Sequence, residues 1–103
     1  MGPGLYEDIY EKSLIVELEL LGLKVECQKS IPVKYKDIKL KCDYRLDLLV
    51  EDKVIIELKA VDELKTIHKK QLLTYLKITD KRLGLLVNFN TADIMHSIIR
   101  IAN

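Results

Sequence analysis

Two carboxylates and a lysine stand at the inner ends of two neighbouring apolar runs. Asp47 lies in the run YRLDLLV, and Glu57 follows ten positions later in VIIELKA, with Lys59 two residues beyond it. A charged side chain in such a segment is costly unless it is paired or bound to a metal ion. Hard divalent cations prefer carboxylate oxygens, and an amine beside them suits attack on a phosphodiester. The pattern therefore predicts a Mg²⁺ or Mn²⁺ site with phosphodiester-cleaving chemistry.

This site depends on how the two runs pair. Side chains of a strand alternate between its faces, so Glu57 and Lys59 are expected to share one face. If Val50 pairs with Val54 across a three-residue loop, Asp47 falls directly opposite Glu57. Opposed side chains are about 4.5–5.5 Å apart at Cβ, close enough to share one ion. A two-residue turn would place the acids on opposite faces.

Strict alternation also predicts the faces of the first run. Arg45 is expected on the same face as Asp47, where it is a candidate for substrate contact. The opposite face is expected to hold four apolar side chains, namely Tyr44, Leu46, Leu48 and Val50.

The surrounding pattern predicts a mixed α/β fold with the order αβββαβ. A helix is expected from Leu5 to Leu21, with Gly22 as its C-terminal cap. Three strands joined by hairpins and a helical crossover to a fourth give a mixed sheet flanked by helices. The remaining expected elements are strands at 23–35, 38–50, 53–61 and 82–89, a helix at 64–78, and a short final strand at 97–101.

Composition limits the class of protein. The chain has 103 residues, 49% of them hydrophobic and 32% charged, which fits one soluble domain. No apolar run approaches the ~18 residues of a membrane span, and the start lacks a signal peptide, so a cytoplasmic location is expected. Cys27 and Cys42 are expected to be reduced structural residues in strands.

Charge is nearly balanced overall but uneven along the chain. The net charge is +1, yet six lysines and only two acidic residues fall between Lys24 and Lys41. This cluster is typical of a phosphate-binding patch. It is equally typical of an edge strand protected against aggregation.

The helices offer further candidates. Gln71 and Tyr75 are four residues apart, with His68 three residues earlier, so they share one helical stripe. Glu7 and Tyr10 are three apart in the first helix. Glu7 is therefore a candidate oxygen ligand if this helix packs beside the strands.

The chain resembles the GxxExxY proteins, a branch of the PD-(D/E)XK nuclease superfamily. The resemblance covers nearly the whole sequence and rests on five ordered motifs. They are Gly4-Leu5-Tyr6-Glu7-Asp8-Ile9-Tyr10, Tyr44-Arg45-x-Asp47 to Val50, Glu57-Leu58-Lys59-Ala60, Gln71 to Leu76, and Gly84 to Phe89.

The resemblance implies a restriction-endonuclease-like fold and a role for each matching residue. Asp47, Glu57 and the backbone carbonyl of Leu58 would hold the metal ion, and Glu7 would complete the site. Lys59 would orient or deprotonate the attacking water and stabilise the transition state. Gln71 and Tyr75 would support the site and contact the substrate.

Two departures from the family accompany the resemblance. Leu46 stands where the superfamily often has proline. Relatives usually carry another helix before the Gly-Pro-Gly segment, so residues 1–103 are expected to form one nuclease-like domain without that helix, either as a shortened protein or because the sequence starts at an internal methionine. The apolar surface left bare suggests a homo-oligomer.

The leading hypothesis is a metal-dependent nuclease acting on DNA or RNA, with no membrane partner. The alternatives are a catalytically inactive nucleic-acid-binding or assembly module, a dimerising structural protein, and an unrelated metal-binding or phosphatase-type hydrolase. A partner protein or a fused neighbouring domain is expected to supply targeting.

Overall fold

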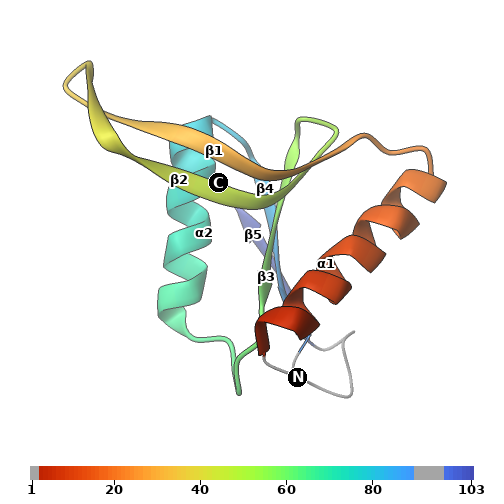
Figure 1. Ribbon diagram of the computed structural model, residues 1–103. Coiled ribbons are helices and arrows are strands. Elements are labelled where there is room, and N and C mark those ends of the chain that lie inside the picture. Colours follow the sequence, from red (N-terminus) through yellow and green to blue (C-terminus); the bar gives the residue numbers. More distant parts are fainter. Residues whose placement is uncertain (1–2, 90–96) are drawn as a thin grey trace.

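The computed structural model describes residues 3–89 and 97–103, with side chains for all of these except 3–7, 35 and 40–43. Two helices accompany one five-stranded sheet over these residues (Figure 1). In chain order the elements are α1 (Pro3–Leu20), β1 (Val25–Tyr35), β2 (Ile38–Val50), β3 (Val54–Lys59), α2 (Thr66–Thr79), β4 (Leu83–Asn88) and β5 (Ile98–Ala102).

The sheet is mixed and follows chain order, β1-β2-β3-β4-β5. Antiparallel pairing joins β1 to β2, β2 to β3, and β4 to β5. β3 and β4 are parallel, and α2 makes the crossover between them. The predicted fold class, element order and final strand are therefore confirmed.

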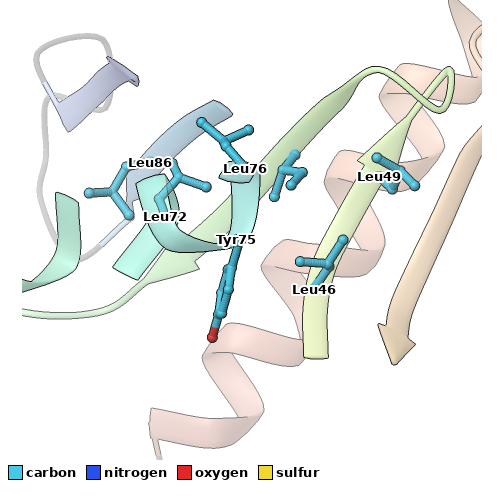
Figure 2. Close-up of a cluster of buried hydrophobic side chains, with 7 residues drawn as sticks. Leu46, Leu49, Leu72, Tyr75, Leu76 and Leu86 are labelled. Carbon is cyan, nitrogen blue, oxygen red and sulfur yellow. The ribbon is translucent and has the colours of Figure 1, made fainter. Parts of the chain in front are cut away.

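The helices cover opposite faces of the sheet. On β3, Ile55 packs in the cluster that contains Leu72 and Leu76 of α2, whereas its neighbour Ile56 packs in the cluster against α1. Figure 2 shows the α2 cluster, in which Tyr75 points its hydroxyl away from the leucines. Among residues 3–89 and 97–103, neither helix is long and apolar enough to span a membrane.

α1 begins two residues earlier than predicted, at Pro3, and ends one residue earlier, at Leu20. The glycine cap that follows it is as predicted. Gly22 adopts a positive φ of 82°, and the amide of Leu23 donates to the carbonyl of Leu18 at 3.1 Å. A glycine tolerates this left-handed conformation without steric cost.

Gly84 of β4 allows α2 to approach the sheet closely. A Cβ atom at this position would lie 2.9 Å from the side chain of Leu72. Because Leu72 is fully buried, it has little room to move. The site residues on α2 are thereby held close to β3.

Strict alternation along β2 proved wrong. Tyr44 and Leu46 pack in the α2 cluster, whereas Leu48 and Val50 pack in the α1 cluster. The change falls at Asp47, where the β2–β3 ladder ends at the pair Leu48–Ile56. Gln28, which the β1–β2 register places opposite Asp47, has a φ of 51°. The hairpin therefore turns away from β3 and passes over α2 (Figure 1).

Candidate active site

Asp47 and Glu57 meet where β2 separates from β3. Val50 pairs with Val54 across a three-residue loop, as predicted, and this register brings the two acids together. The amide of Asp47 donates to Oε1 of Glu57 at 3.2 Å. The amide of Leu58 donates to Oδ2 of Asp47 at 2.8 Å. The carboxylates thus take the place of the ladder hydrogen bonds that the separating strands no longer make.

Glu57 is the more buried of these two acids, and its side chain is only 4% exposed. Burial, reinforced by the negative charge of Asp47, raises the pKa of Glu57 from 4.5 to about 8. The Asp47 amide and the charge of Lys59 oppose this rise but do not cancel it. Two carboxylates in such a setting ionise together only at a cost, which a divalent cation would remove.

Lys59 lies at the end of β3 and begins a chain of hydrogen bonds into α2. Its Nζ donates to Oε1 of Gln71 at 3.0 Å, and Nε2 of Gln71 donates to the hydroxyl of Tyr75 at 3.0 Å. The ring of Tyr75 lies against that of Tyr44, with centroids 5.1 Å apart. Burial and the charge of Glu57 raise the pKa of Tyr75, so its hydroxyl stays protonated at neutral pH.

Asn88 holds the segment that follows Lys59. Its side chain is 4% exposed, accepting from the Val61 amide at 3.1 Å and donating to the Val61 carbonyl at 2.8 Å. Asn88 is the last residue of β4. A single asparagine gives no signal of long-range pairing; its place at the end of a buried strand was the only hint.

A ring contact attaches α1 to the same end of the sheet. Tyr10 stacks on Phe89 with centroids 4.7 Å apart and planes 14° apart. The amide of Phe89 donates to the carbonyl of Lys59 at 3.0 Å. Since Glu7 precedes Tyr10 by three residues, its turn of α1 is fixed beside the end of β3. The side chain of Glu7 lies outside the described ones.

The sequence model of the PD-(D/E)XK nuclease superfamily matches residues 1–101. The chain belongs to the PD-(D/E)XK nuclease superfamily. No curated protein sequence matches it. A solved structure, described as the crystal structure of SSO0001, is similar in fold with a TM-score of 0.70 and 23% sequence identity. The similarity covers 99% of this chain but 53% of SSO0001, so this chain spans about half of that protein's length.

PD-(D/E)XK nucleases generally use divalent metal ions, and the paired acids fit such an ion. Asp47 and Glu57 supply carboxylate oxygens from two adjacent strands. They are two ligands and not a full set: the described side chains contain no group of three or more His, Cys, Asp or Glu that could hold a metal. Glu7, predicted as the third carboxylate, is not among these described side chains.

Two other candidates lie apart from the acid pair in this PD-(D/E)XK chain. Arg45 is exposed on β2, between Tyr44 and Leu46, which both pack toward α2. The change of face at Asp47 thus removes the predicted alignment of Arg45 with the acids. His68 has a structural role, because its Nδ1 accepts the Lys65 amide at 2.9 Å at the start of α2.

The predicted lysine cluster lies on the β1–β2 hairpin, whose outer strand β1 is an edge of the sheet. Lys34 and Lys39 are exposed and directly paired across the strands, while Lys29 pairs with Glu26 at 2.8 Å. Like charges in direct opposition are unfavourable, which favours an anionic partner, but the edge position also fits protection against aggregation. Cys27 is a free, exposed cysteine of β1 rather than a buried one.

Proposed function

We propose that this protein is a Mg²⁺- or Mn²⁺-dependent nuclease that hydrolyses phosphodiester bonds of DNA or RNA. The observation that carries the proposal is the convergence of Asp47 and Glu57 at the separation of two strands. Lys59 follows on the same face of β3 as Glu57 and carries the nearby amine. Membership in the nuclease superfamily supports the same reaction class.

In this proposal the metal ligands are Asp47, Glu57, the Leu58 carbonyl and Glu7. A bound divalent ion supplies Lewis acidity and a more acidic water. Burial of Glu57 supports this ligand set, because an unpaired carboxylate in that position is disfavoured. The stacking of Tyr10 on Phe89 supports Glu7, since it fixes the helix beside β3.

Lys59 orients the attacking water and stabilises negative charge on the phosphoryl oxygens. The water oxygen forms a bond to phosphorus as the bond to the leaving sugar oxygen breaks. The water gives its proton to solvent, and the leaving oxygen takes one from solvent. Gln71 fixes Lys59 through the 3.0 Å hydrogen bond, and Tyr75 fixes Gln71 in turn.

We further propose that the chain belongs to the GxxExxY branch of the superfamily and that Gln71, Tyr75 and Arg45 contact the substrate. Residues 1–103 form a single nuclease domain, located in the cytoplasm. The domain self-associates, and a partner protein or a fused neighbouring domain targets it.

The test is cleavage of single-stranded, double-stranded and branched DNA and RNA with Mg²⁺ or Mn²⁺. We expect wild-type protein to cut at least one substrate, and chelation by EDTA to stop the reaction. Glu57→Gln and Lys59→Met, which keep the side-chain size, are each expected to lower the rate by about 10²-fold or more. Lys53→Met, in the loop before β3, is the matched control.

Cleavage that persists undiminished in both site variants would contradict the proposal. Metal-independent binding without cleavage of any substrate would instead indicate an inactive nucleic-acid-binding module on the same fold.

A further inference from the structure

The two helices carry opposite charge. α1 contains five acidic residues and one lysine, whereas α2 contains three lysines and no acidic residue. These helices cover opposite faces of the sheet, so the net charge of +1 combines an acidic helix on one face with a basic helix on the other. A polyanion is therefore attracted to the α2 side and repelled from the α1 side.

Two of the proposed catalytic groups, Glu57 and Lys59, lie on the α2 side of the sheet. Glu57 follows Ile55 on the face of β3 that packs against α2. Lys59 reaches α2 directly through its hydrogen bond to Gln71. A substrate that approaches over α2 thus meets the site without crossing the acidic helix.

One exposed line of side chains runs along α2, and we call it the α2 ridge. Two exposed isoleucines stand at its ends, Ile67 with 71% of its surface exposed and Ile78 with 41%. Helical spacing aligns the ridge with Gln71, and its members are Ile67, Lys70, Gln71, Thr74, Lys77 and Ile78. Near the first turn a shallow depression of about 430 Å³ is lined by residues of the ridge together with His68.

We infer that a single strand of nucleic acid lies along the α2 ridge, with its phosphates on Lys70 and Lys77. This inference rests on the proposed nuclease function and specifies its substrate. The exposed isoleucines favour a single strand, because its unpaired bases and sugars offer apolar surface, whereas the base faces of a duplex are stacked and out of reach. Gln71, a member of both the ridge and the site, joins the bound strand to Lys59.

A binding assay without divalent metal tests this inference independently of cleavage. The full chain is titrated in EDTA into a fluorescein-labelled 15-nucleotide oligothymidylate and into a 15-base-pair duplex, and anisotropy is followed from low to high salt. We expect tighter binding of the single strand. The double variant Lys70→Ala/Lys77→Ala should weaken it about tenfold and reduce the salt slope by roughly 1.4, since each phosphate contact on a single strand contributes about 0.7.

Two further variants make the test specific. Ile67→Ser/Ile78→Ser should weaken binding by about threefold with an unchanged salt slope, because it removes apolar contact alone. Lys12→Ala/Lys53→Ala removes the same charge from α1 and from the loop before β3, and should leave affinity within about twofold. Thermal unfolding of every variant establishes that it is folded.

Three results would overturn the inference: no measurable binding of the single strand, tighter binding of the duplex, or equal losses in the ridge and control variants. A different result would contradict the nuclease proposal alone: the ridge variants lose binding as expected, but wild-type protein with Mg²⁺ cleaves none of the DNA or RNA substrates.

Discussion

The backbone amide of Asp47 is hydrogen-bonded to the Glu57 carboxylate across the point where β2 and β3 part, at 3.2 Å. The same two residues therefore join the two strands and form the centre of the candidate metal site. The reciprocal bond, from the Leu58 amide to Asp47, is shorter at 2.8 Å. Each acid is held by the backbone of the opposite strand, so neither requires a further side chain to fix its position.

Stability of the metal-free protein should fall as pH rises from about 4.5 to about 8. The raised pKa of Glu57 means that the folded state holds a proton which the unfolded state has released in this interval. The free energy of unfolding should decrease by at most about 1.4 kcal/mol per pH unit from this group. Glu57→Gln should remove this component and exceed wild type in stability at pH 8. Urea unfolding in EDTA at several pH values measures this pH dependence. If the stability of Glu57→Gln fell with pH as steeply as that of wild type, Glu57 would not be the titrating group.

Divalent cations should reverse that loss. Mg²⁺ or Mn²⁺ at about 100 times its Kd should raise the free energy of unfolding by about 2.7 kcal/mol, because it binds the folded state. The rise in Tm should be larger at pH 8 than at pH 5, where protonation of Glu57 competes with the ion. Asp47→Asn should lose most of the shift. K⁺ at equal ionic strength is the control, and an equal shift with K⁺ would mean that only screening is observed.

The hydrogen bonds that link Lys59, Gln71 and Tyr75 should matter more for the cleavage rate than for folding. Tyr75→Phe removes the acceptor of the Gln71 amide at little cost in packing, so we expect a loss of stability near 1 kcal/mol. Gln71→Leu frees Lys59 directly and should lower the cleavage rate about 10-fold or more. The matched control is Thr66→Val, in the exposed first turn of α2 and outside the α2 ridge. Rates at saturating substrate measure the effect, and equal rates for Gln71→Leu and Thr66→Val would exclude a positioning role.

Much of the site geometry could be predicted from the sequence. The condition for a shared site was a three-residue loop that pairs Val50 with Val54, and the register confirms this pairing. Gly22, the end of α1 and the boundaries of β2 likewise follow from local signals.

Prediction from the sequence failed where tertiary packing overrides the regular alternation of a strand. Nothing in YRLDLLV indicates that Leu46 and Leu48 pack against different helices, because the change depends on Gln28 of another strand and on the end of the β3 ladder. The role of Asn88 depends on Val61, 27 residues away, which no periodicity can reveal.

The stack of Tyr10 on Phe89 should couple α1 to the site. Tyr10→Phe keeps both rings, so stability and cleavage should stay close to wild type. Tyr10→Ala loses the stacking and buried area and should cost about 3 kcal/mol. If Glu7 acts as we propose, metal affinity should fall in Tyr10→Ala as well. Isothermal titration with Mn²⁺ compares the two; unchanged affinity in a folded Tyr10→Ala protein would remove the argument for Glu7.

The departure of β2 from β3 divides the hairpin into a fixed and a variable part. The described core contacts of the hairpin extend outward as far as Ile31 and Tyr44, and past them the register already shifts between Pro32 and Lys34. Residues could be inserted at the tip without changing the alignment of Asp47 with Glu57. The outer half of the hairpin can therefore vary in length and sequence while the paired acids keep their geometry.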